Sequence, residues 1–273
     1  MGEIRSKTVA QNTPALPHSP TPPLPISPSP SLDPCRLLAW DSEFFGFGVA
    51  MVEGSRLDDE RVAAVLDWCR RQRIRCAYFL AETDDPQTLQ LAQRHAFELQ
   101  DIRITAELAS AAWQTLDLPP AGIAIRPGRI DDIPELRRIA ATAYRHSRFY
   151  FDQRFDRQKC DLLYAQWIES FCRRGAEQVR VAERAGCFQG YVCCEPDGPA
   201  AGRIGLTGVD AASRNQGIGR RLVVDALRWF HERGIQRPTV VTQSRNLPAQ
   251  RLYQRCGFVT QAVHLWYHRW FDA

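Results

Sequence analysis

The sequence predicts an α/β protein built as two units behind a proline-rich tail. Extended and helical patterns alternate from Arg36 to the C-terminus. A proline-containing connector, LDLPPAG, interrupts this alternation at residues 116–122. Half of the 18 prolines fall in the first 34 residues, where regular structure cannot form. We therefore expect a disordered tail over 1–34, a small α/β unit over 35–118 and a second unit over 119–273.

Composition excludes several classes of protein. A hydrophobic content of 44% over 273 residues is enough for a globular core. The net charge is only +4 and the arginines are dispersed among acids, so no basic face for nucleic acid is predicted. The tail prolines interrupt any secretory signal, and no run of 18 apolar residues exists to cross a membrane. We expect a soluble protein that binds neither nucleic acid nor membrane.

The cysteines and histidines give no sign of a disulfide framework or a metal site. Nine cysteines is an odd number, no C-x-x-C pair occurs, and Cys193 and Cys194 would point to opposite faces of a strand. Reduced thiols indicate a cytoplasmic location. His264 and His268 lie in a segment that we interpret as extended, where they would be about 13 Å apart, too far to share a metal ion. No metal is expected.

In the first unit, strands and helices alternate at short spacing. Strands are predicted at RLLAW, GVAMVEG, CAYFLAE and FELQDIRITAEL, and helices near Asp59 to Arg71 and Pro86 to His95. The stretch WDSEFFG is expected to shape this unit rather than to contact substrate.

The second unit opens with a strand near Ile123 to Arg126 and a helix capped by Asp131 or Asp132. An aromatic and basic loop, YRHSRFYFDQRF, precedes a helix from about Arg157 to Arg173. The elements expected after it are the strands QVRVAE, CFQGYVCCE and RIGLTGVD, a helix closed by Gly234, the strand TVVTQ, a helix near Ala249 to Arg255, and two terminal strands, FVTQAV and HLWYHRW.

A faint internal repeat connects the two units. TLQLAQRHAFELQ (88–100) aligns without gaps with AQRLYQRCGFVTQ (249–261). The alignment is as compatible with chance similarity at a helix-to-strand corner as with a true repeat. Ala92 stands in the first copy where Tyr253 stands in the second, so any chemistry is expected in the second unit.

The segment SRNQGIGRRLVVDAL (213–227) places Gly217 and Gly219 at the start of an apolar helical pattern. A helix start offers unpaired N–H groups and the positive end of the helix dipole, and glycine lets an anion approach that backbone closely. The segment therefore predicts a phosphate cradle, although a G-x-G before a helix is also common as a plain turn.

The order strand, R-x-x-G-x-G, helix, strand and NLPAQRLYQRCGF (246–258) resembles the GNAT family of acetyl-CoA-dependent N-acyltransferases over residues 123–273. The resemblance implies the GNAT fold with a mixed, mostly antiparallel sheet, the first unit being a degenerate GNAT-like half. It implies an enzyme of the N-acetyltransferase class with acetyl-CoA as co-substrate. The residues it assigns to the coenzyme are Leu206, Thr207, Gly208, Val209, Arg214, Gln216, Gly217, Ile218, Gly219, Arg220, Arg221 and Asn246.

By the same resemblance an amine attacks the thioester directly and Tyr253 protonates the leaving thiolate as general acid. Transfer from a tyrosine of pKa about 10 to a thiolate of pKa about 8.5 is uphill by roughly 2 kcal/mol in water. The resemblance also implies a strand near Leu206 to Val209 that splays from its neighbour, and Gly205 and Gly208 are compatible with such distortion. The general base stays open: many members of the family use a chain of water molecules, and Glu183, Glu195, Asp210 and His146 are the candidate side chains.

The acceptor is predicted from the first half and from three aromatic stretches. AWDSEFFGFGVA, HSRFYFD with YAQWIES, and HLWYHRW resemble the GNAT branch that acetylates the 4-amino group of dTDP-4-amino-4,6-dideoxygalactose. Arg145, His146, Arg148 and Tyr150 are the candidate contacts for such a nucleotide-linked sugar, or else a packed hinge. Two alternatives remain open: an enzyme acting on a protein or peptide amine, and a non-catalytic acyl-CoA sensor. A homodimer is also left open.

Overall fold

The computed structural model describes residues 33–115 and 123–272. The predicted tail and connector fall largely or wholly outside these residues. The elements before the connector are β1 (Cys35–Leu37), α1 (Ala39–Phe45), β2 (Gly48–Val52), α2 (Asp59–Arg71), β3 (Ile74–Glu82), α3 (Pro86–Arg94), β4 (Glu98–Leu108) and the 3₁₀ turn η1 (Ser110–Thr115).

The elements after the connector are β5 (Ala124–Pro127), η2 (Ile130–Asp132), α4 (Ile133–Ala143), α5 (Arg148–Phe151), α6 (Arg157–Gly175), η3 (Ala176–Gln178), β6 (Val179–Arg184), β7 (Cys187–Asp197), β8 (Ala201–Val209), η4 (Ala211–Ser213), α7 (Ile218–His231), β9 (Arg237–Gln243), α8 (Leu247–Arg255) and β10 (Phe258–Trp270). No helix in the described part of the chain is long and apolar enough to span a membrane.

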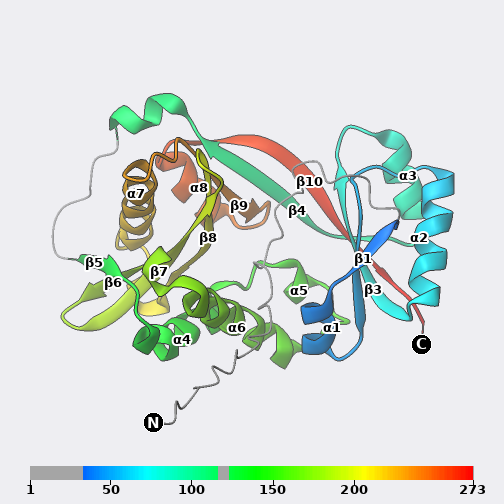
Figure 1. The fold of residues 1–273 in the computed structure, drawn as a ribbon, viewed down its shortest axis with the longest axis horizontal. Helices are drawn as coiled ribbons and strands as arrows, with labels where there is room; N and C mark the ends of the chain where they lie inside the picture. Colours follow the sequence, from blue (N-terminus) through cyan, green and yellow to red (C-terminus); the bar gives the residue numbers. More distant parts are fainter. Residues whose placement is uncertain (1–32, 116–122, 273) are drawn as a thin grey trace, which may run out of the picture.

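The strands of the described residues form one sheet of ten, in the order β1-β2-β3-β10-β4-β9-β8-β7-β6-β5. Only β2 with β3 and β8 with β9 pair in parallel, so the sheet is mixed and mostly antiparallel as predicted. The C-terminal strand β10 lies between β3 and β4 of the first unit. Figure 1 shows β4 and β10 running side by side as the long connection between the two ends of the molecule.

The middle of the sheet is symmetric in topology. The order β2-α2-β3-α3-β4 recurs as β8-α7-β9-α8-β10. The last strand of each series pairs with the middle strand of the other series: β4 pairs with β9, and β10 pairs with β3. The aligned segments, 88–100 and 249–261, occupy the same place in the two series. The two units consequently share one continuous sheet.

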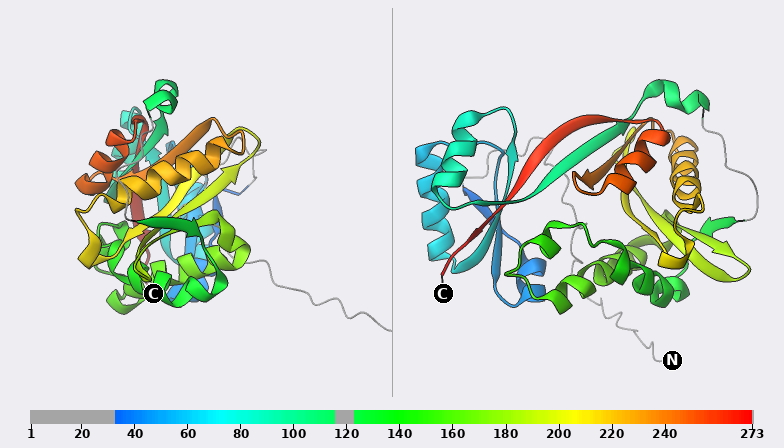
Figure 2. Two further views of the ribbon diagram at one scale, coloured as in Figure 1. Left: turned by 90° about the vertical axis from the view of Figure 1, so that its left-hand side faces the viewer. Right: turned by 180° about the vertical axis from the view of Figure 1, so that it is seen from behind.

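Helices cover both faces of the sheet, and alternate residues of each strand belong to different cores. On β3, Tyr78 packs with α5 and α6, while its neighbour Phe79 packs with α2 and α3. Cys193 and Cys194 likewise point into opposite cores, as predicted. The α7 and α8 helices cover the same face as α2 and α3, which leaves α4, α5 and α6 on the other face (Figure 2).

Three segments differ from the expected elements. The stretch beginning at Ala39 forms α1, although no side chain caps its first turn, so it depends on packing of Phe45 and on the left-handed Gly46 at its end. The predicted aromatic loop contains the short helix α5. The two predicted terminal strands are one strand, β10, with register shifts that accommodate its bend.

Candidate active site

One cavity of about 650 Å³ opens where β8 separates from β9. The two strands pair only from Ala201 opposite Arg237 to Ile204 opposite Val240. Beyond this point β8 stays with β7 and β9 stays with β4, so their facing edges diverge around the cavity. Gly205, Leu206 and Thr207 line one side of the opening and Val241 lines the other. The predicted splay is therefore present.

The start of α7 forms one wall of the cavity. Gly217 has a left-handed φ of 77°, and the first hydrogen bond in this helix runs from Arg221 N to Gly217 O at 3.1 Å. The amides of Ile218, Gly219 and Arg220 come before that bond, so they have no acceptor within the helix. A Cβ built on Gly217 would meet no atom within 4 Å. This helix start is thus an open, positively polarised site for an anion.

Gly219 has a packing role as well. A Cβ at this position would lie 3.1 Å from Leu252 Cδ2 of α8. The glycine therefore lets α7 approach α8 closely. The α8 helix carries Tyr253, and Asn246 directly precedes it. Asn246 caps α8 by accepting a hydrogen bond from Ala249 N at 3.3 Å, and it also lines the cavity.

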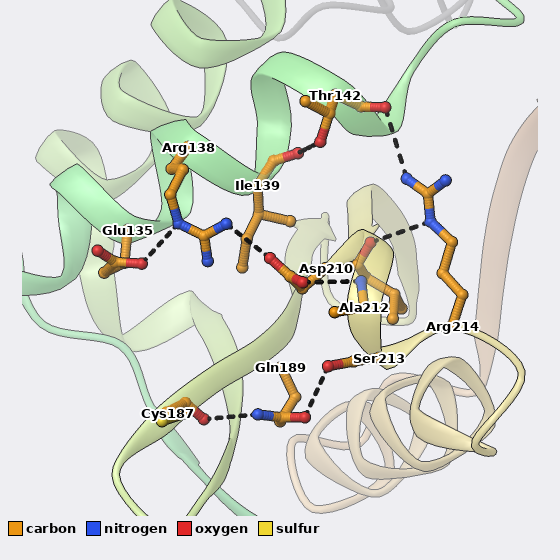
Figure 3. A network of polar contacts seen from close by, with 11 residues as sticks. Glu135, Arg138, Ile139, Thr142, Cys187, Gln189, Asp210, Ala212, Ser213 and Arg214 are labelled. Carbon is orange, nitrogen blue, oxygen red and sulfur yellow. Dashed lines mark hydrogen bonds and ion pairs between the residues drawn. The ribbon is translucent and has the colours of Figure 1, made fainter.

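The loop that leads from β8 into α7 is held by polar contacts to its neighbours (Figure 3). Arg138 of α4 donates to Asp210 at 2.7 Å, and Asp210 caps η4 by accepting from Ala212 N at 3.0 Å. Ser213 donates to Gln189 of β7 at 2.7 Å. Arg214 reaches back to the carbonyl oxygens of Val209 and Thr142 at 3.4 and 3.5 Å. These contacts fix the approach to the helix start.

Tyr253 lines the cavity from α8 and is only 7% exposed. Its ring packs edge-on against Phe258, with centroids 5.9 Å apart. Burial raises the pKa of Tyr253, while the Thr207 hydroxyl acts in the opposite direction. The phenol is therefore protonated at neutral pH and available as a proton donor.

The other side of the cavity is built from both halves of the chain. Asp101 and Arg103 of β4 lie two residues apart, so they share a face of that strand, and both are buried. Trp266 of β10 pairs opposite Asp101 and belongs to the same core as α5 and α6. The rest of this wall comes from the end of α4, the α4–α5 loop, α5 and α6: Ala143, Tyr144, His146, Ser147, Arg148, Tyr164 and Trp167.

Asp101 is the only carboxylate that lines the cavity among the described residues. Burial raises its pKa to about 6, against the opposing charge of Arg245, whose guanidinium lies 3.2 Å from Asp101 Oδ1. Burial lowers the pKa of Arg103 to about 10, and the charges of Arg203 and Arg148 add to this effect. One acidic and one basic side chain thus line the same cavity, and both are buried away from solvent.

Most predicted coenzyme contacts lie at the cavity. Those that line it are Leu206, Thr207, Val209, Arg214, Gly217, Ile218, Gly219, Arg220 and Asn246. Gly208, Gln216 and Arg221 do not line it. Gly208 packs under the ring of Tyr191, with an added Cβ 2.8 Å from Cε1, and Gln216 bonds to Arg184 and to the carbonyl of Ala212.

The predicted substrate residues divide into two pairs. His146 and Arg148 line the cavity, whereas Arg145 and Tyr150 do not. Arg145 pairs with Asp161 at 3.2 Å, and the Tyr150 hydroxyl donates to the same carboxylate at 2.6 Å. Both side chains are thus held against Asp161 of α6.

The four candidate bases can also be divided by whether they line the cavity. Glu183 is ion-paired with Arg126, Glu195 with Arg203 and Asp210 with Arg138, and none of these three carboxylates lines the cavity. His146 alone of the four does. Sequence reasoning missed Asp101 and Arg103, because β4 also carries Glu98 and Glu107 and nothing in its sequence distinguishes the two residues that line the cavity.

The corresponding helix start of the first series is different. The α2 helix begins after Asp58, whose carboxylate accepts from Arg61 N at 2.7 Å, and Asp59 and Glu60 occupy its first turn. Carboxylates therefore take the place that the glycine-rich start of α7 leaves open, and they would repel a phosphate. No group of three or more potential metal ligands occurs in the described ranges.

Residues 134–258 match the acetyltransferase (GNAT) family. This stretch is a GNAT acetyltransferase domain, and the chain is an acetyl-CoA-dependent N-acetyltransferase that acts on an amine. It is 28% identical over 245 residues to dTDP-fucosamine acetyltransferase of Escherichia coli O6:H1, covering 88% of this chain and 98% of that relative.

A second curated relative matches over a shorter range. Mycothiol acetyltransferase of Thermobispora bispora is 32% identical over 96 residues, which cover 33% of this chain and 32% of that protein. Among solved structures, a GCN5-related N-acetyltransferase from Sphaerobacter thermophilus superimposes with a TM-score of 0.62 at 15% identity, covering 86% of this chain and 76% of that one. A tandem GNAT protein from the clavulanic acid biosynthesis pathway gives 0.57 at 14% identity, covering 82% and 76%. These structures share the GNAT fold with this chain.

Proposed function

We propose that the chain transfers the acetyl group of acetyl-CoA to the 4-amino group of a nucleotide-linked amino-deoxy sugar of the dTDP-4-amino-4,6-dideoxygalactose type. Similarity to the Escherichia coli enzyme over nearly its whole length supports this acceptor. One observation carries the reaction: a single cavity is bounded by the start of α7, the opening between β8 and β9, and Tyr253. Both substrates are small molecules.

Tyr253 is the proposed general acid. The coenzyme pyrophosphate binds the free amides of Ile218 to Arg220, and the acyl arm extends along the separated edge of β8. When the amine attacks the thioester carbon, the C–S bond breaks and Tyr253 donates its phenolic proton to the departing thiolate. Burial supports this role because it keeps the phenol protonated and also destabilises the thiolate that receives the proton.

Asp101 is the proposed base. An amine must lose a proton before or during its attack, and the acceptor must arrive on the side of the thioester opposite the coenzyme wall. Asp101 faces the cavity from that side, and its raised pKa of about 6 lies between those of an ordinary carboxylate and an ammonium. A carboxylate with this pKa is mostly ionised at pH 7 and accepts a proton more readily than an exposed aspartate.

A panel of acceptors tests the function. Nucleotide-linked amino sugars, free amino sugars, peptides and polyamines are each mixed with acetyl-CoA, and free thiol release is followed. We expect turnover with the nucleotide-linked amino sugars and only background with peptides. Turnover restricted to a peptide would assign the chain to the protein-acetylating alternative, and coenzyme binding without any turnover would assign it to the sensor alternative.

The substitution Tyr253→Phe tests the acid. We expect kcat to fall by about 100-fold or more, the usual contribution of a positioned acid, while the Kd for acetyl-CoA stays unchanged. Tyr267→Phe is the matched control, because Tyr267 is also buried but packs in the first-unit core away from the cavity. If both variants retain wild-type kcat, Tyr253 is not the acid.

A further inference from the structure

Arg103 is a deeply buried arginine at the centre of the sheet. It is 4% exposed and lines the cavity from the β4 face shared with Asp101. In register it stands opposite Gln243 on β9 and His264 on β10. Moving a guanidinium into such surroundings costs several kcal/mol unless an anion compensates it.

Within the described part of the chain, the side chain of Arg103 has no hydrogen-bond or ion-pair partner, and its Nε atom is buried without an acceptor. Other inward-facing arginines behave differently. The side chains of Arg126, Arg180 and Arg203 are 22%, 15% and 14% exposed, and each is ion-paired with a carboxylate at 2.5–2.7 Å. Arg103 is more buried than any of them, yet no carboxylate reaches it.

The charged neighbours of Arg103 increase this imbalance. Arg148, which also lines the cavity, lies over the rings of Trp266, Phe149 and Tyr78 at 4.2, 4.3 and 4.9 Å, and its Nε is likewise buried without an acceptor. Burial and the charge of Arg103 lower the pKa of His264, so this neighbour is neutral. It therefore supplies no negative charge to balance Arg103. Asp101, the one carboxylate that lines the cavity among the described residues, is engaged with Arg245 and with the Ile102 amide. Burial raises the pKa of Asp41 and the charge of Arg148 opposes this shift, but this carboxylate does not line the cavity.

We propose that Arg103 and Arg148 form a subsite for an anionic group on the acceptor, so that the ligand itself supplies the missing counter-charge. This inference rests on the proposed acetyltransferase function and names the residues that select its acceptor. A planar guanidinium binds phosphate and carboxylate oxygens in pairs, and Arg148 is already oriented by its aromatic neighbours. The group that fits the proposed acceptor is the diphosphate next to the sugar, and a carboxylate is the other source of the same chemistry.

The first experiment compares acceptors with and without the anion. KM and kcat are measured for a dTDP-linked amino sugar, the corresponding free amino sugar and a carboxylate-bearing amine, with wild type, Arg103→Gln and Arg103→Lys. We expect Arg103→Gln to raise KM for the dTDP-linked sugar by about 10- to 100-fold, the usual effect of losing a charge-assisted hydrogen bond, with little change for the free sugar. The KM of Arg103→Lys for the dTDP-linked sugar should lie between those of wild type and Arg103→Gln.

The second experiment measures binding without turnover. Calorimetry follows dTDP and inorganic pyrophosphate in the presence of saturating coenzyme A, which occupies the start of α7. We expect Arg103→Gln and Arg148→Gln each to weaken dTDP binding at least about tenfold and to leave the Kd of coenzyme A unchanged. Arg180→Gln is the matched control, because Arg180 is largely buried but paired with Asp225 away from the cavity.

These outcomes separate the two proposals. If wild type acetylates none of the amines, the proposed function fails, and dTDP binding still tests the subsite. If Arg103→Gln loses only the carboxylate-bearing amine, the anion subsite stands with a carboxylate as its ligand. Equal losses for charged and neutral acceptors, or unchanged dTDP binding in both arginine variants, would overturn the inference. Should Arg103→Gln fail to fold, Arg103→Lys and Arg148→Gln carry the same comparisons.

Discussion

Asp101 gives the pH dependence that we expect of the reaction. Its pKa is raised to about 6 because it is buried, and as a base it acts only when ionised. The wild-type kcat/KM should therefore fall as the pH drops below about 6. In Asp101→Asn the limb near pH 6 should disappear, and kcat/KM at pH 7.5 should drop by about 100-fold. Initial rates between pH 5 and 8 check both effects.

Asp41 is the control for this experiment. Its pKa is also raised to about 6 by burial, but it does not line the cavity. Asp41→Asn should keep the acidic limb of wild type. If the acidic limb instead disappears in Asp41→Asn and persists in Asp101→Asn, the group that titrates is Asp41. Asp101 is then not the base.

The side of the cavity formed by the start of α7 and by α8 could be predicted residue by residue because its signal is local. Gly217, Gly219, Asn246 and Tyr253 lie within one helix–strand–helix segment, and it is this segment that carries the resemblance to the GNAT family. Asp101 is about 150 residues away from Tyr253 along the chain and meets the same cavity only because β4 pairs with β9. No pattern within β4 specifies that pairing, so the acceptor side required the structure.

At the scale of elements, the start of α7 combines a backbone requirement with a binding role. Alanine at position 217 would adopt the left-handed φ of 77° at a cost of about 1 kcal/mol. Its methyl group would also point into the open space at the helix start. We expect Gly217→Ala to lower the free energy of unfolding by about 1 kcal/mol and to raise the Kd for acetyl-CoA about tenfold. Denaturant unfolding and calorimetry measure the two effects.

Gly234 provides the matched control at the other end of the same helix. It has a φ of 75°, and a Cβ there would also meet nothing within 4 Å. Gly234→Ala should lower the free energy of unfolding as much as Gly217→Ala does and leave the Kd for acetyl-CoA unchanged. If both alanine variants bind acetyl-CoA like wild type, the helix start is not the phosphate site.

Long, periodic elements with end signals were predicted well, whereas short ones that depend on packing were not. The α2 helix begins and ends at the predicted residues because Asp58 caps it and its apolar positions recur at helical spacing. The α1 helix has no capping side chain and only seven residues, so little in its sequence favours a helix over a strand. Its conformation depends on Trp40 and Phe44, which stack at 5.0 Å, and on the core below.

At the scale of the molecule, the exchange of β4 and β10 makes the two halves dependent on each other. Without residues 119–273, β3 would lose its neighbour β10, and β4 would lose both of its neighbours, β10 and β9. We expect fragment 1–118 alone to show no cooperative unfolding, and co-expressed fragments 1–118 and 119–273 to associate and recover acetyltransferase activity. Circular dichroism and size-exclusion chromatography check this. A cooperative transition in fragment 1–118 alone would contradict it.

The position of β10 also bears on biosynthesis. The strand that completes the amino-terminal part of the sheet leaves the ribosome about 150 residues after β4. At ordinary elongation speeds this is a delay of roughly 10 to 30 seconds. During that interval the nascent chain would expose the long edges of β3 and β4, and unpaired strand edges can pair with other chains.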